Sequence, residues 1–160
     1  MKHWKIGEKI LKIGTQIDEH TQIKNNRDDI KNLSSIESVD KKLIDEAKLA
    51  FENIGNNIES VELKTALQES MRYVSKVNVY LNETEPWKVI KEDKDRAARI
   101  LYTSLQAIDA CASLLYPFMP TTSKKVSEAI PKETSNSWDV NEIKIGAELT
   151  EIGHLFKKFD

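Results

Sequence analysis

A tryptophan followed by lysines is the feature of this 160-residue chain that is best suited to binding chemistry. Trp87 directly follows Pro86, with Lys88 next to it and Lys91 about one helical turn further on. An indole offers a flat face on which an unstacked base can lie, and nearby cations suit a phosphate backbone. These residues at this spacing predict a contact surface for single-stranded RNA. Spacing alone leaves open a tryptophan that only packs a helix corner.

Two further cations precede that tryptophan. Arg72 and Lys76 lie one helical turn apart, and we expect them to converge with Lys88 and Lys91 on one end of a helical bundle. Phosphate contacts made there would add salt dependence but no sequence information. A solvated helix face explains the same charges equally well, and this alternative stays open.

Other chemistry-bearing residues do not form a recognisable catalytic or metal-binding pattern. Cys111, the only cysteine, lies beside the apolar Ala112 and is predicted to be an inert core thiol. His3, His20 and His154 have no ligand spacing among them, so no metal site is predicted. The many carboxylates offer no pair in an apolar pocket, so no catalytic residue is nominated.

Composition restricts the function classes. With 31% charged and 39% hydrophobic residues, the chain is an ordinary globular domain whose length suits one core. A net charge of −2 argues against a sequence-blind nucleic-acid or DNA binder, which should be basic overall. The chain contains no apolar run near the roughly 18 residues of a membrane span, and its start is no secretory signal. We therefore expect a cytoplasmic location and no membrane partner.

The elements that must position Trp87 are helices. Proline disfavours helical geometry in the residue before it but suits a first helical turn, so Trp87 should lie in a helix–loop–helix corner. Apolar residues at three- and four-residue spacing predict a helix from Asp40, its N-cap, to Gly55, which marks its end or a tight break. A second helix is predicted from Ser60 to the corner. The stripe of the second helix is expected to be Leu63, Leu67, Met71, Val74, Val77 (or Asn78) and Leu81.

A third helix is predicted from about Asp95 to Tyr116, with its central spine on the side of Leu101, Leu105, Ile108 and Leu115. Lys94, Arg96 and Arg99 alternate with acids at its start and predict salt bridges there. A short helix capped by Thr121 or Thr122 should follow Pro120 and end before Pro131.

The predicted fold is all-α: an antiparallel bundle of four or five helices with a C-terminal strap. We place the bundle at residues 39–131, the linker and strap at residues 132–160, and an atypical segment that packs on the bundle at residues 1–38.

Three motifs in order resemble a known family. They are Asn78-x-Tyr80 with Pro86-Trp87; the run Pro117-Phe118-Met119-Pro120 after a long helix; and Ile143-Lys-Ile-Gly146 with the closing Gly153-His-Leu-Phe-Lys-Lys-Phe159. Together, from Leu43 to Asp160, they resemble the anticodon-binding domain of methionyl-tRNA synthetase, and the tail is similar to archaeal-type members.

The resemblance implies that the chain binds methionine tRNA at its CAU anticodon loop, with Asn78, Pro86 and Trp87 at the recognition corner and the four cations nearby. It also implies that ATP and methionine bind a catalytic domain that is missing or separate, because the sequence lacks the His-x-Gly-His and Lys-Met-Ser-Lys-Ser motifs. We therefore expect no cofactor and no active site on this chain alone, as in a fragment of a methionine–tRNA ligase.

The chain departs from the family at its start. Family members carry an Asn-x-x-x-Arg pair that reads anticodon bases, and the nearest material here is Asn25-Asn26-Arg27. Two alternatives to the anticodon module stay open for this reason. One is a stand-alone, synthetase-derived RNA-binding or regulatory protein, and the other is a helical protein-interaction bundle without RNA binding.

Overall fold

The computed structural model describes residues 38–133, 137–152 and 155. In these residues the chain folds into helices, and β structure is limited to one isolated bridge between Lys132 and Ile143. The predicted all-α class is confirmed. The helices are α3 (Ser38–Glu59), α4 (Leu63–Thr84), the single-turn α5 (Pro86–Val89), α6 (Lys94–Leu115) and α7 (Pro120–Ala129).

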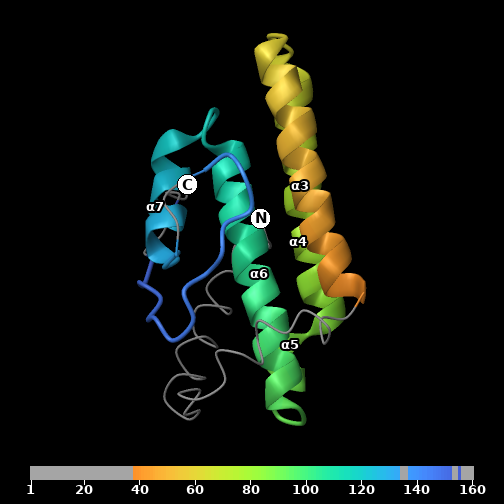
Figure 1. Ribbon diagram of the computed structural model, residues 1–160, viewed down its shortest axis with the longest axis vertical. Helices are drawn as coiled ribbons and strands as arrows, with labels where there is room; N and C mark the ends of the chain where they lie inside the picture. Colours follow the sequence, from red (N-terminus) through yellow and green to blue (C-terminus); the bar gives the residue numbers. More distant parts are fainter. Residues whose placement is uncertain (1–37, 134–136, 153–154, 156–160) are drawn as a thin grey trace, which may run out of the picture.

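Successive long helices run in opposite directions (Figure 1). Helices α3 and α4 form a long hairpin, α6 packs against both, and α7 packs on the far side of α6. Their apolar faces meet in one core, because each helix hides one stripe from water. The largest contributions come from Leu43, Phe51, Ile54, Tyr73, Val77, Tyr80, Leu81, Ile100, Leu101 and Leu114.

Helix α4 buries a different face from the one we predicted. Leu63, Leu67 and Met71 are 51%, 39% and 47% exposed. The residues that face the core in this part of the helix are Ala66 and Ser70. Small residues let α4 approach its neighbours closely, and the Ser70 hydroxyl donates to the carbonyl oxygen of Ala66 (2.9 Å). The predicted stripe holds only towards the corner, where Val77 and Leu81 are buried.

The spine of α6 is also displaced from the predicted side. Leu101 and Leu115 are buried as expected, but Leu105 and Ile108 are half-buried. Fully buried positions of α6 include Ile100, Ser104, Ala107 and Leu114, so small side chains occupy part of its buried face. Leucine spacing identified the helix, whereas close packing selected a face with small residues.

Helix α3 continues through Gly55, where we predicted its end or a tight break. A Cβ at Gly55 would lie 3.1 Å from Nε1 of Trp138, tighter than most real contacts. The Trp138 indole donates to the Phe51 carbonyl oxygen (2.9 Å) and meets the Phe51 ring edge-on at 5.2 Å. The glycine therefore makes room for an indole from the C-terminal segment rather than ending the helix.

The C-terminal segment crosses the bundle as an extended strap, as predicted. Beside the bridge to Ile143, the Lys144 amide donates to the carbonyl oxygen of Pro131, and Thr150 donates to that of Ala129 (3.0 and 3.1 Å). Below them, the fully buried Asp109 of α6 receives Nζ of Lys132 at 2.7 Å and the amide of Asn141 at 2.9 Å. Strap and bundle are thus joined by buried polar contacts.

Three sequence expectations fall partly or wholly outside the described residues. They are the packing of residues 1–38, the substitute material at Asn25-Asn26-Arg27 and most of the closing Gly153–Phe159 motif. In the described ranges, no helix has both the length and the apolar character needed to cross a membrane.

Candidate nucleic-acid interface

The corner that carries Trp87 is built around Glu85 and Pro86. Glu85 ends α4 in the left-handed region, at φ 40°, and its amide donates to the Leu81 carbonyl oxygen at 3.2 Å. Pro86 then opens α5 at the position where its missing N–H costs nothing. Positive φ is uncommon outside glycine, so the chain reverses here at a cost that its surroundings must offset.

Trp87 is half-buried and packs against the core with Val89 and Ile90, while Pro86 is buried. The ring is therefore only partly open to solvent, and it is not a freely exposed platform. The corner folds back onto α6, and the indole covers part of the apolar end of the bundle. Part of the residue's surface remains exposed to solvent.

The two lysines of the corner differ in their surroundings. Nζ of Lys88 lies 2.7 Å from Oε1 of Glu85, three residues earlier, and the Lys88 side chain is 68% exposed. Lys91 is exposed. Because an exposed ion pair is weak, the Glu85 carboxylate reduces the local positive potential without immobilising Lys88.

Arg72 and Lys76 do not join this group. Arg72 pairs with Glu69 on the surface of α4 (3.1 Å), and Lys76 pairs with Glu46 of α3 (3.2 Å). Arg72 also precedes the end of α4 by about 18 Å along the helix axis, at 1.5 Å per residue. The structure thus brings together Pro86, Trp87 and Lys88, with Lys91 close by in sequence. Arg72 and Lys76 lie elsewhere.

Asn78 lies on α4 two residues after Lys76. At 100° per residue, the two side chains leave the helix on nearly opposite sides. Since Lys76 reaches α3, the half-buried Asn78 side chain points to the other flank of α4. Asn78 is thus separated from the Lys76–Glu46 pair and lies two residues nearer to the corner.

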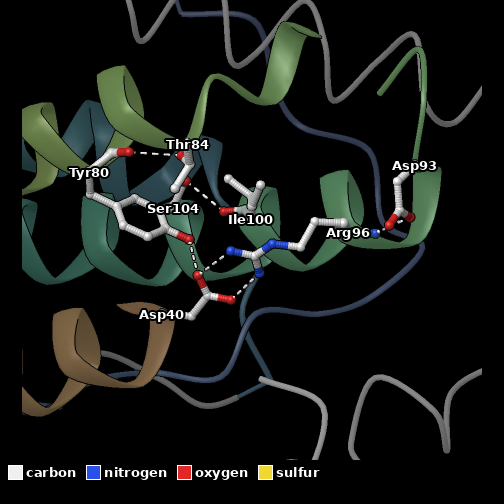
Figure 2. Close-up of polar contacts among 7 residues, drawn as sticks. All are labelled: Asp40, Tyr80, Thr84, Asp93, Arg96, Ile100 and Ser104. Carbon is white, nitrogen blue, oxygen red and sulfur yellow. Dashed lines mark hydrogen bonds and ion pairs between the residues drawn. The ribbon is translucent and has the colours of Figure 1, made fainter. Parts of the chain in front are cut away.

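Beneath the corner lies a buried polar cluster that the sequence reading missed (Figure 2). Asp40 of α3 is fully buried, and its carboxylate binds both Nη atoms of Arg96, the second at 2.9 Å. The Tyr80 hydroxyl donates to the same carboxylate at 2.6 Å. Burial, and then the hydrogen bond to Asp40, raise the pKa of the Tyr80 hydroxyl well above its usual range, so it stays a donor. We call Asp40, Tyr80 and Arg96 the Asp40 cluster.

The sequence predicted local roles for two members of this cluster. Asp40 was expected to be an N-cap, and Arg96 was expected to belong to a salt-bridged helix start. The N-cap of α6 is Asp93, whose Oδ1 accepts a hydrogen bond from the backbone amide of Arg96 (2.8 Å). The guanidinium of Arg96 extends to Asp40 of α3. Tyr80 belongs to the Asn78-x-Tyr80 motif and lies on the buried face of α4, where a hydroxyl needs a partner.

Elsewhere in the described residues, no group of three or more histidine, cysteine or acidic side chains could hold a metal ion. Cys111 packs against the core, and burial raises the pKa of its thiol, which disfavours the reactive thiolate. The Tyr73 hydroxyl donates to the Leu43 carbonyl oxygen at 3.2 Å.

The fold and the corner define an all-α bundle that presents a tryptophan at a helix–loop–helix turn. One solved relative shares this fold: the free-state methionyl-tRNA synthetase of Mycobacterium tuberculosis. It superposes with a TM-score of 0.69 at 19% sequence identity, over 78% of this chain and 27% of that one.

Sequence comparison is more specific. The family described as the anticodon binding domain of methionyl tRNA ligase matches residues 31–160, and the chain belongs to this family. Methionine–tRNA ligase of Corynebacterium glutamicum is 37% identical over 101 residues, which are 62% of this chain and 17% of that protein. The enzyme of Chloroflexus aurantiacus is 41% identical over 91 residues, or 57% and 15%.

The longest of these alignments is with methionine–tRNA ligase of Saccharopolyspora erythraea, which is 32% identical over 158 residues. It includes 79% of this chain and 26% of that protein. The chain thus spans between about a seventh and a quarter of the length of these relatives.

Proposed function

We propose that this chain binds the anticodon loop of methionine tRNA at the corner formed by Glu85, Pro86 and Trp87. The observation that carries the proposal is a half-buried indole on a single-turn helix, in a chain of the anticodon-binding family. One part of the ring is anchored on the core, and the other part is left for a base to stack on.

The charges at the corner favour recognition by stacking over attraction by charge. Lys88 and Lys91 are accompanied by Glu83, Glu85 and Glu92. Such a mixed surface provides little non-specific affinity for a phosphate backbone. It suits a module that reads one loop of one RNA. The half-buried Asn78 side chain, which leaves α4 on the flank away from α3, is a second candidate for base contact.

Within a complete ligase, we assign ATP and methionine to the portion of the protein that this chain does not span. The function proposed for the chain is recognition of tRNA, in a cytoplasmic enzyme of translation, and not the ligation step. Mixed with ATP and methionine, the chain alone should form no adenylate.

Titration with synthetic anticodon stem-loops tests the proposal. One stem-loop carries CAU, and the other differs in the first anticodon base. Tighter binding of the CAU stem-loop supports the anticodon module. Equal binding of both favours a stand-alone RNA-binding protein, and binding of neither favours a protein-interaction bundle.

A further inference from the structure

The recognition corner is attached to the bundle on both sides by one side chain. Tyr80 lies in the last turns of α4, before the corner, and Arg96 lies in the first turn of α6, after it. Both bind the Asp40 carboxylate: Tyr80 at Oδ1 (2.6 Å), and Arg96 at Oδ1 (2.9 Å) and at Oδ2. A single carboxylate on a third helix therefore closes the loop that contains Trp87 (Figure 2).

The corner has few means of holding its own shape. Helix α5 is one turn long, and a helix of that length is unstable by itself. Glu85 adopts a left-handed conformation that disfavours any residue with a Cβ. The Lys88–Glu85 ion pair is exposed and weak. The geometry of the corner must therefore be set by the residues on which it rests.

The Asp40 cluster is suited to this task because it is buried and directional. Asp40 is 0% exposed at its side chain, and Arg96 is 11% exposed. Breaking a buried ion pair is costly, since a misplaced partner leaves a buried charge without compensation. Two helix ends that share one carboxylate can satisfy it only in one relative position.

We propose that Asp40 is a positioning residue for RNA recognition: through Tyr80 and Arg96 it holds the two arms of the corner so that Trp87 is presented in its binding position. This rests on the proposed function. Asp40 does not touch the ligand. It raises the fraction of molecules whose corner is ready to bind, and apparent affinity is proportional to that fraction.

The test compares Asp40→Asn with Asp109→Asn in the full chain. Both replacements are isosteric, and both remove a fully buried carboxylate that is paired with a cation. Asp109 serves as the matched control because its partners, Lys132 and Asn141, belong to the linker and strap rather than to the corner. The first readout is amide hydrogen exchange at Lys88–Asp93, whose amides bond within the corner. The second is affinity for the CAU stem-loop.

Asp40→Asn should remove most of the exchange protection in the corner, and it should weaken stem-loop binding about tenfold if the competent fraction falls to one tenth. Amides in the middle of α3 and α4 should stay protected, which separates release of the corner from unfolding. Asp109→Asn should leave both corner readouts unchanged. If Asp40→Asn does not fold, Tyr80→Phe removes one arm of the cluster and should give a smaller change in the same direction.

Unchanged corner exchange in a folded Asp40→Asn protein would overturn the proposal, as would equal corner exchange in the two variants. Failure of the wild-type chain to bind the stem-loop would instead contradict the proposed function. Because the exchange measurement needs no RNA, the two failures can be told apart.

Discussion

Two carboxylates that are buried among the described residues connect different parts of the chain. Asp40 and Asp109 are both fully buried and both ion-paired. Asp40 joins three helices at the end that carries Trp87, whereas Asp109 joins α6 to a strap of irregular structure. The same chemistry thus fixes a candidate recognition corner in one region and fastens a covering segment in the other.

The difference lies in the partners. Asp40 receives a guanidinium fork and a phenol, two rigid groups whose geometry restricts the helices that carry them. Asp109 receives a flexible lysine and an amide, and that lysine also reaches the Ser127 hydroxyl. A lysine is a point charge on a flexible stem, which suits attachment of a segment better than exact orientation.

The largest expected effect comes from removing the cation that pairs with the buried Asp40. Arg96→Met keeps the length of the side chain but leaves a buried carboxylate with one hydroxyl donor, so unfolding free energy should fall by about 3–5 kcal/mol. Lys132→Met is the counterpart and should lie at or below the low end of that range, because Lys132 makes one contact with Asp109 whereas Arg96 makes two with Asp40. Urea denaturation followed by circular dichroism measures both. A larger loss for Lys132→Met would reverse the comparison.

The sequence identified these regions unequally. Periodicity and proline placement predicted α4, α6, α7 and the corner to within a few residues. They failed for the Asp40 cluster, because its members are 16 to 56 residues apart and only tertiary packing joins them. Each also had a plausible local role: Asp40 as a cap, Arg96 in a salt-bridged helix start and Tyr80 within a motif.

The stripe on α4 failed for a related reason. Leu63, Leu67 and Met71 repeat at helical spacing, yet the structure buries Ala66 and Ser70 instead. Periodicity locates an amphipathic helix, but it does not decide between adjacent faces when one has leucines and the other has small residues that permit close approach. That choice depends on the neighbouring helix, which a single stripe does not describe.

Trp87 and Trp138, the two tryptophans among the described residues, extend the comparison between the corner and the strap. If Trp87 stacks on an anticodon base, Trp87→Ala should weaken stem-loop binding by about 1–3 kcal/mol. Because this ring is half-buried, stability should fall as well, so binding is measured at a temperature at which the variant is folded. Trp138→Ala should lower stability through loss of its bond to Phe51 but leave RNA affinity unchanged. Normal RNA binding by folded Trp87→Ala would make this indole a packing residue only.

A smaller effect is expected at the contact between α3 and the strap. In a helix interior, alanine is favoured over glycine by about 0.5–1 kcal/mol. Gly55→Ala should not realise that gain in the wild-type chain, because the new Cβ would press on Nε1 of Trp138 at 3.1 Å. In a Trp138→Leu background the gain should appear. A double-mutant cycle of unfolding free energies measures the coupling, and additivity within error would contradict the packing role of Gly55.

The smallest effect separates the two lysines of the corner. Each phosphate contact that is lost should reduce the salt dependence of RNA binding by about one unit of slope, and affinity should fall similarly for any sequence. Because Glu85 already neutralises part of the charge on Lys88, Lys91→Ala should change this slope more than Lys88→Ala. Glu85→Gln provides the control. It removes the carboxylate that pairs with Lys88, so at low salt this variant should bind the stem-loop more tightly than the wild type does. If both lysine variants keep the wild-type slope and Glu85→Gln has no effect, the phosphate backbone passes the corner without touching it. Recognition would then depend on Trp87 and on the geometry that the Asp40 cluster gives it.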